Sequence, residues 1–132
     1  MTNKIVLVDD DPIIQYVHLR ILKKYSSQTI MQFENGSDAL AYFEGNGKAE
    51  EPSLVLLDIN MPIMGGWEFL DAVFQQGLNK NMLVIVLTSS VDILDMEKAK
   101  SYDNIISFEQ KPLTTDKVSA HPVLLKYLEQ TS

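Results

Sequence analysis

Three aspartates follow short apolar segments and could together bind a divalent cation. Asp9 and Asp10 come directly after the run Ile5 to Val8, and Asp58 follows the run Leu54 to Leu57. Three neighbouring carboxylates repel one another at neutral pH, so a proton or a cation must neutralise them. Mg²⁺ prefers oxygen ligands and is commonly held by one or two carboxylates together with phosphate oxygens. The aspartates therefore predict a magnesium site, with Mn²⁺ as the other possible occupant, to which a phosphate group also binds.

The expected ligands have separate roles. Asp10 and Asp58 would bind the metal directly, Asp9 directly or through water, and the main-chain carbonyl of Asn60 would complete the protein's share. A carboxylate can also attack phosphorus and form an acyl phosphate. Asp58 is the aspartate that we expect to act in this way.

A hydroxyl and an ammonium group follow two later apolar runs. Thr88 comes after the run at 82–87, and Lys111 lies shortly after the run at 105–108. Phosphoryl transfer depends mainly on positioning and on neutralising the three equatorial oxygens, which one metal ion, one ammonium and one hydroxyl donor can do. Pro112 follows Lys111, and a fixed turn there would direct the lysine towards the strand ends. The pattern leaves the cis or trans state of this bond open.

The alternation of apolar runs with segments of helical period predicts an α/β fold with a parallel sheet. The runs at 5–8, 54–57, 82–87 and 105–108, with a segment at 29–33, give five strands. Fully apolar runs are typical of strands that are buried on both faces. In an open α/β sheet, ligands bind outside the carboxyl ends of the strands. The three aspartates, Thr88 and Lys111 should therefore converge at this edge.

Helices are expected between the strands. The first is capped by Asp11, begins at Pro12 and turns the face of residues 14, 17, 21 and 25 inward. A short helix with Leu40 and Phe43 inward follows the second strand, and further helices are predicted from Trp67 to Gln76 and from 93 to 101. Residues 114–119 could begin a last helix, but Pro122 would break it, so the better helix runs from 122 to 129, delayed or kinked. Its inward residues would be Val123, Tyr127 and either Leu128 or Leu124.

Composition excludes several classes of function. The 132 residues suit one domain, and we expect a single domain over 1–132, with residues 45–52 as an exposed loop and no output domain after the last helix. A net charge of −7 argues against nucleic-acid binding. No run approaches the roughly 20 apolar residues of a membrane span, and no secretory signal is recognisable, so a cytoplasmic location is expected. The absence of cysteine excludes disulfides and thiolate chemistry.

Four motifs carry a resemblance to the response-regulator receiver domain. They are Val8-Asp9-Asp10-Asp11-Pro12, the segment Leu57 to Gly66, Leu87-Thr88-Ser89 and Lys111-Pro112. In order and spacing these motifs resemble the signatures of that family. The resemblance extends from about Lys4 to the last helix. The resemblance implies a flavodoxin-like doubly wound sheet of five parallel strands in the order 2-1-3-4-5, with five helices.

The resemblance also implies a function as a signalling switch rather than an enzyme. Asp58 would accept a phosphoryl group from a histidine kinase or histidine phosphotransfer protein, and Thr88, Ser89 and Lys111 would contact that group. Thr88 and the aromatic Phe108 would then switch a surface formed by the fourth helix, fifth strand and fifth helix, which binds an unknown downstream protein. Asn60 and Ser90 would shape water access and so the lifetime of the phosphate.

The sequence departs from the family pattern at three places. Gly65-Gly66 stands where the family often has an acid followed by glycine, and Phe108 lacks the phenol hydroxyl of some members. Glu109-Gln110 and Pro122 alter the face where partners commonly dock. These departures concern the partner rather than phosphate acceptance.

Two other functions are kept as alternatives. A phosphorylation-independent adaptor would retain the fold but not the chemistry, and the complete set of acids, hydroxyl and lysine weighs against it. A phosphohydrolase of the haloacid dehalogenase type expects its nucleophile on the first strand and a second carboxylate two residues later. Here Asp58 lies on the third strand and Asn60 follows it.

Overall fold

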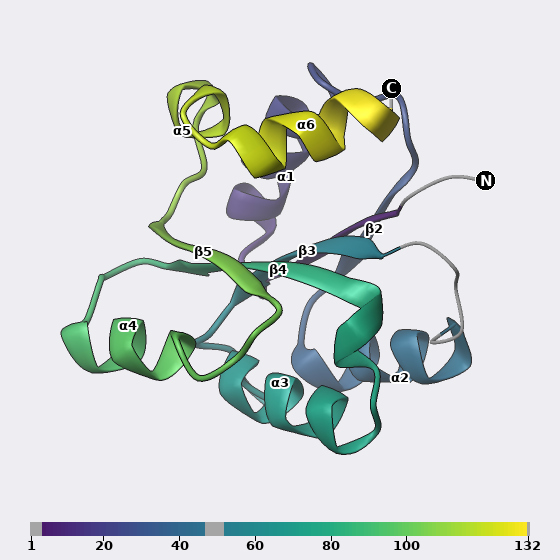
Figure 1. Cartoon of the computed structure of the whole chain (residues 1–132), viewed down its shortest axis with the longest axis vertical. Coiled ribbons are helices and arrows are strands. Elements are labelled where there is room, and N and C mark those ends of the chain that lie inside the picture. The colour runs from purple at the N-terminus through teal and green to yellow at the C-terminus, as the bar shows by residue number, and fades with distance from the viewer. Residues whose placement is uncertain (1–3, 47–51, 132) are drawn as a thin grey trace.

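The computed structural model describes residues 4–46 and 52–131, and its centre is one sheet of five parallel strands. The strands are β1 (Ile5–Val8), β2 (Ile30–Phe33), β3 (Ser53–Asp58), β4 (Met82–Thr88) and β5 (Ile105–Gln110). Their order across the sheet is β2-β1-β3-β4-β5 (Figure 1). The predicted fold class and strand order are confirmed.

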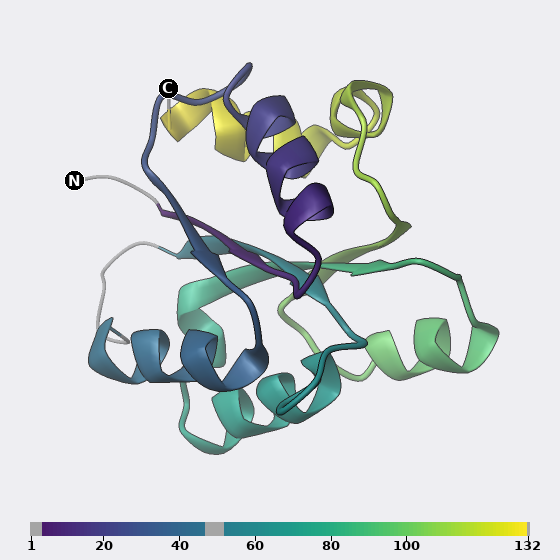
Figure 2. The ribbon, with the colours of Figure 1, turned by 180° about the vertical axis from the view of Figure 1, so that it is seen from behind.

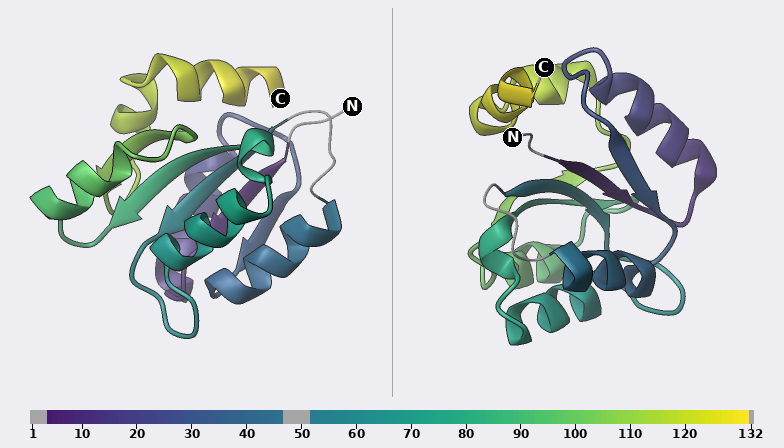
Figure 3. Two further views of the ribbon diagram at one scale, coloured as in Figure 1. Left: turned by 60° about the horizontal axis from the view of Figure 1, so that its bottom comes forward. Right: turned by 90° about the vertical axis from the view of Figure 1, so that its right-hand side faces the viewer.

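Helices cover both faces of the sheet. On one face lie α1 (Pro12–Leu22), α5 (Thr115–Ser119) and α6 (Pro122–Thr131). The other face carries α2 (Gly36–Asn46), α3 (Gly66–Gln75) and α4 (Ile93–Ala99), and a short 3-10 helix, η1 (Asn79–Asn81), precedes β4. Figures 2 and 3 show the same three layers from behind and from two further sides.

Successive strand residues supply two separate apolar cores, because side chains alternate between the faces of a sheet. Val6 and Val8 of β1 join the core under α2 and α3, which includes Phe69, whereas Ile5 and Leu7 join the core that contains Leu22 of α1. All four residues of β1 and all six of β3 are buried. Their continuous apolar runs are thus explained by burial on both faces.

The register of the sheet decides which side chains meet at its carboxyl edge. Val8 pairs with Leu57, so Asp9 lies level with Asp58 on the neighbouring strand. Between β4 and β5 the register shifts by one residue, because Val84 pairs with Ile105 but Ile85 pairs with Ser107. After this irregularity Thr88 pairs with Gln110, which leaves Lys111 as the first residue beyond the paired strands.

The start of α1 agrees with the prediction, but its buried face does not. The Asp11 carboxylate accepts hydrogen bonds from the backbone N–H groups of residues 13 and 14, and Pro12 begins the helix. The predicted inward residues at 14, 17 and 21 are only half-buried. The helix instead buries Gln15, His18 and Leu22, because the two polar side chains find hydrogen-bond partners inside the protein.

The C-terminal region contains two helices, so the described chain has six α-helices where five were expected. Thr114 caps α5 by accepting a hydrogen bond from the N–H of Lys117, and Pro122 begins α6 as predicted. The choice of Val123 as an inward residue was wrong, since it is 53% exposed. The other three candidates, at 124, 127 and 128, are all buried.

The expected loop at 45–52 needs a correction at its start. Helix α2 continues through residues 45 and 46, and residues 47–51 lie outside the described part of the chain. Phe43 is buried and Leu40 packs against the same core, as expected for this helix.

Candidate functional site

Asp9, Asp10 and Asp58 lie together at the carboxyl edge of the central strands. Each offers one carboxylate oxygen, and these oxygens all lie within 4.8 Å of one another. Asp9 and Asp58 are buried, with 4% and 3% of their surface exposed, whereas Asp10 is exposed. A set of carboxylate oxygens that is open on one side suits a hard divalent cation, which keeps some of its own water. The donor set therefore fits the predicted metal.

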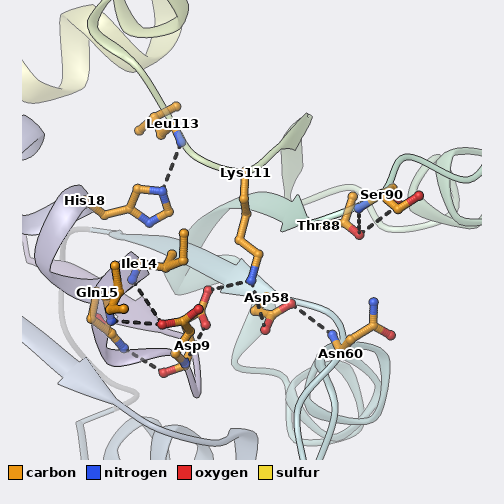
Figure 4. Close-up of polar contacts among 12 residues, drawn as sticks. Asp9, Ile14, Gln15, His18, Asp58, Asn60, Thr88, Ser90, Lys111 and Leu113 are labelled. Carbon is orange, nitrogen blue, oxygen red and sulfur yellow. Dashed lines mark hydrogen bonds and ion pairs between the residues drawn. The ribbon is translucent and has the colours of Figure 1, made fainter.

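Lys111 reaches these aspartates from the end of β5. Its Nζ lies 3.0 Å from Oδ2 of Asp9 and 3.4 Å from Oδ2 of Asp58, and its side chain is only 11% exposed. Figure 4 shows the lysine extending between the two carboxylates. Burial alone would lower the pKa of Lys111, but the hydrogen bond to Asp9 and the two negative charges outweigh this effect and raise the pKa. The lysine is thus charged at neutral pH.

Burial makes the two inner carboxylates costly to ionise. It raises the pKa of Asp58 to about 6; the charge of Asp9 acts in the same direction, and the N–H of Asn60 and the charge of Lys111 oppose it. Burial also raises the pKa of Asp9, against the N–H of Asp11 and the contacts with Lys111. Added positive charge would favour both ionised forms. The electrostatics thus favour cation binding.

Backbone groups orient both carboxylates. The N–H of Asn60 donates to Oδ1 of Asp58 at 3.0 Å, and the N–H of Asp11 donates to Oδ1 of Asp9 at 2.9 Å. In each case the other oxygen faces Lys111. Asn60 itself is exposed. Each buried carboxylate is therefore held at both of its oxygens.

Gly66 allows α3 to start directly against the end of β3. A Cβ atom there would lie 2.7 Å from Cα of Ile59 and 2.8 Å from the backbone oxygen of Asp58, closer than such contacts allow. The N–H of Gly66 donates to the carbonyl of Ile59 at 3.1 Å. The preceding Gly65 is fixed through its N–H, which donates to Glu68. The two glycines belong to a well-bonded helix start.

The bond between Lys111 and Pro112 is cis, which the sequence had left open. The backbone N–H of Lys111 donates to the carbonyl of Thr88 at 2.7 Å. The N–H of Leu113, on the other side of the proline, donates to Nε2 of His18 at 2.9 Å. The segment that carries the lysine is thereby held by two different elements.

Thr88 is buried at the end of β4, which pairs with β3 beside Asp58, but its hydroxyl bonds to its own loop. Its hydroxyl donates to the carbonyl of Ser90 at 3.0 Å and accepts from the N–H of Ser90 at 3.3 Å. Ser89 and Ser90 are exposed, and the carbonyl of Ser89 accepts a hydrogen bond from Gln110. The structure places these groups at the same edge as the aspartates, with the Thr88 hydroxyl turned to its own loop (Figure 4).

The remaining predicted residues lie around this centre. Phe108 is half-buried and packs against the core under α3, and Pro112 is exposed. Met61, Met64 and Trp67 pack against the same core.

Two buried polar residues of α1 support the site and were not predicted to do so. The side-chain amide of Gln15 donates to the carbonyls of Asp9 and Phe33, both at 3.0 Å, and so joins the ends of β1 and β2. The contact of His18 with Leu113 was likewise not predicted. A signal was present in the sequence: both residues stand next to the predicted apolar face of α1.

Comparisons with known proteins agree with this geometry. The sequence model of the family described as response regulator receiver domain matches residues 5–121. Sporulation initiation phosphotransferase F of Bacillus subtilis is 30% identical over 128 residues, which cover 97% of this chain and 95% of that protein. The probable C4-dicarboxylate response regulator DctR of Halalkalibacterium halodurans is 29% identical over 89% of this chain.

Among solved structures, a two-component response regulator from Cytophaga hutchinsonii has a TM-score of 0.82 and 28% identity, covering 95% of this chain and 97% of that one. The chain spans only part of several curated relatives: 48% of the length of DctR, and 39% of the virulence regulator BvgA of Bordetella pertussis.

Proposed function

This chain belongs to the response regulator receiver domain family, and we propose on that basis that Asp58 accepts a phosphoryl group from a histidine kinase or histidine phosphotransfer protein. The observation that carries the proposal is the convergence of three carboxylates and one ammonium group at the sheet edge. Receiver domains are signalling switches. The donor, the downstream partner and a cytoplasmic location are parts of this proposal.

The proposed reaction is a displacement at phosphorus. A carboxylate oxygen of Asp58 forms a bond to the phosphorus of a phosphohistidine, and the P–N bond breaks with its electron pair going to the imidazole. Asp9, Asp10, Asp58 and the main-chain carbonyl of Asn60 would hold Mg²⁺, or Mn²⁺ in its place. The metal would neutralise charge on the phosphoryl oxygens.

Lys111 and Thr88 have different parts in this proposal. Lys111 already lies between two carboxylates and would exchange one of these contacts for a phosphoryl oxygen. Thr88 would have to give up its hydrogen bonds with Ser90 to reach that oxygen, with Ser89 beside it. Phosphorylation adds about −1.5 to −2 charges at this point, which favours such an exchange. The movement of Thr88 is the proposed start of the switch.

The proposed output is a change in the surface formed by α4, β5 and α6, where α6 is the helix predicted as the fifth. Phe108 lies half-buried on β5 and would turn inward as Thr88 moves. On α4, Ile93 and Leu94 are 75% and 79% exposed, so this surface offers apolar area to a downstream protein. Asn60 and Ser90 are exposed beside the site and would set how readily water reaches the phosphate.

The alternatives have less support. The position of Asp58 on β3, followed by the amide Asn60, does not match the haloacid dehalogenase arrangement. An adaptor without phosphorylation would not need a lysine side chain that is only 11% exposed between two buried aspartates. In the described parts of the chain, no helix has the length and apolarity that a membrane crossing requires.

The proposal is tested by incubating the protein with acetyl phosphate and Mg²⁺ and measuring its intact mass. The wild type should gain one phosphoryl group, and Asp58→Asn should gain none. Asp11→Asn is the matched control, because Asp11 lies outside the cluster and asparagine also caps helices; it should be labelled like the wild type. Absence of any adduct would favour the adaptor, and repeated turnover of phosphate esters would favour the hydrolase.

A further inference from the structure

The segment that carries Lys111 is held by few hydrogen bonds. Pro112 has no N–H, so the nearest backbone donors are those of Lys111 and Leu113. The first donates to Thr88 on β4, and the second to His18 on α1. On the exposed side, Nζ of Lys117 contacts the carbonyls of residues 110 and 112 at 2.6 and 3.2 Å. In addition to the contacts of Lys111 itself with Asp9 and Asp58, His18 thus holds this segment to the interior.

His18 is suited to act as a fixed acceptor. It is 2% exposed, and Leu113, its partner, is 1% exposed. Burial lowers the pKa of His18 to about 4, with the charges of Lys111 and Lys117 acting in the same direction. The ring is therefore neutral at physiological pH. Because Nε2 accepts the hydrogen bond, the proton of the neutral ring lies on Nδ1.

The position of His18 links the two halves of the site. Helix α1 begins directly after the segment that contains Asp9 and Asp10, and His18 lies on its inner face. Its bond to Leu113 therefore connects the helix that follows the acids to the segment that carries the lysine, 95 residues further along the chain (Figure 4). A displacement of that segment would move Lys111 relative to both carboxylates.

We propose that His18 is a positioning residue for phosphoryl transfer, which holds the Lys111 segment through the N–H of Leu113 so that the lysine meets the phosphoryl group. This inference rests on the proposed function. A misplacement of about 1 Å at a reacting group can lower a rate by about 10²-fold. If His18 positions Lys111, the decrease in the phosphoryl-transfer rate on removing His18 should occur only when Lys111 is present.

Two substitutions separate positioning from simple packing. His18→Leu keeps an apolar side chain in the cavity but leaves the buried N–H of Leu113 without an acceptor, whereas the amide oxygen of His18→Gln can accept that bond. The rate of labelling by acetyl phosphate with Mg²⁺ should fall about tenfold or more in the leucine variant. The glutamine variant should recover most of the rate. The rates are compared at saturating Mg²⁺, because a shift of Lys111 relative to Asp9 and Asp58 also changes the affinity of these carboxylates for the metal.

His121 provides a matched control. Its Nδ1 accepts the N–H of Leu124 at 3.1 Å, and its Nε2 lies 3.3 Å from the carbonyl of Ile106. His121→Leu therefore also leaves a backbone N–H without its imidazole acceptor, but at the start of α6 rather than next to Pro112. This variant should keep the wild-type rate. Denaturant unfolding of every variant establishes that it is folded at the assay temperature.

A double-mutant cycle completes the test. In a Lys111→Ala background, His18→Leu should have no further effect on the labelling rate, because the residue it positions is gone. The inference would be overturned if wild type and His18→Leu had equal labelling rates. It would also be overturned if His18→Leu lowered the labelling rate as much in the Lys111→Ala background as in the wild type. Either result would leave phosphate acceptance by Asp58 intact. A wild-type protein that takes up no phosphoryl group would overturn both.

Discussion

Asp58 and His18 are two buried titratable side chains on either side of Lys111, and burial moves both towards their neutral forms. It raises the pKa of the carboxyl to about 6 and lowers the pKa of the imidazole to about 4. The carboxyl becomes charged by losing a proton, whereas the imidazole becomes charged by gaining one. Their contributions to stability therefore change with pH in opposite directions.

Without metal, we expect these two contributions to oppose one another between about pH 4 and 6.5. Since the pKa of Asp58 is raised by folding, its contribution is present below about pH 4 and is lost as the pH rises through 6. The pKa of His18 is lowered by folding, so its contribution is present above 6.5 and is lost as the pH falls through about 4. Each contribution is on the order of 2–3 kcal/mol.

Urea unfolding in EDTA checks this balance. Asp58→Asn removes the carboxyl, so its free energy of unfolding should rise relative to wild type as the pH increases through this range. His18→Gln should show the opposite trend. Three curves that run parallel across the range would show that these groups do not titrate as described.

At the scale of elements, α4 is attached to α3 by side-chain contacts rather than by deep burial. Ala99 is its buried residue. The indole N–H of Trp67 on α3 donates to Asp95 at 3.2 Å, and the Trp67 ring stacks on Tyr102 with a centroid distance of 5.6 Å. The hydroxyl of Tyr102 donates to Asp71 at 2.6 Å. These contacts hold α4, whose outer side is part of the proposed output surface, against its neighbour.

Tyr102→Phe should loosen this attachment. The ring stack stays, but the hydrogen bond to Asp71 is lost, at a cost of about 1 kcal/mol. Relative to the wild type, amide hydrogen exchange should become faster in α4, and the increase should be larger there than in α1. Lys100→Ala is the matched control, because it removes an exposed ion pair with Glu97 worth less than about 1 kcal/mol. Equal exchange of α4 in the two variants would show that the hydroxyl does not hold the helix.

At the scale of the whole molecule, the site exists only in the folded chain. Its acids come from the ends of β1 and β3, and its lysine from the end of β5. A ligand that binds the folded form alone stabilises it by an amount that grows with its concentration. Metal binding and global stability should therefore be linked.

Magnesium should raise the free energy of unfolding of the wild type, by about 2.7 kcal/mol at 100 times its dissociation constant. Asp10 is exposed, so Asp10→Asn should have nearly wild-type stability without metal but a much weaker response to it. Asp11→Asn should keep the full response. Thermal or urea unfolding with and without Mg²⁺ measures the stability of each variant and its increase on adding the metal. An equal increase in Asp10→Asn and Asp11→Asn would contradict the proposed ligands.

The parallel strands and the location of the site were predictable because both depend on local patterns, whereas the strand order was implied by the resemblance to the receiver family. The run Ile5 to Val8 is apolar throughout and ends in acids, and a parallel sheet places all such ends at one edge. The contacts of Lys111 with Asp9 and Asp58 follow from that arrangement.

Features that depend on distant partners were not predictable. A helical pattern turns polar residues outward, but His18 is buried because its acceptor meets the N–H of a residue on another segment. Val123 is apolar and yet exposed, because α6 begins at Pro122 as a separate helix with its own inner face. The cis bond before Pro112 likewise leaves no trace in the residue pattern.

The sequence separation of 102 residues from Asp9 to Lys111 has a consequence for biosynthesis. A ribosome that adds about 5–20 residues per second needs roughly 5–20 s to make the chain between them. During that interval the nascent chain carries its acids without the ammonium that will neutralise them. Because the sheet brings the acids together only when the chain folds, and β5 is the last of its strands to be made, the carboxylates meet one another only once Lys111 can meet them too.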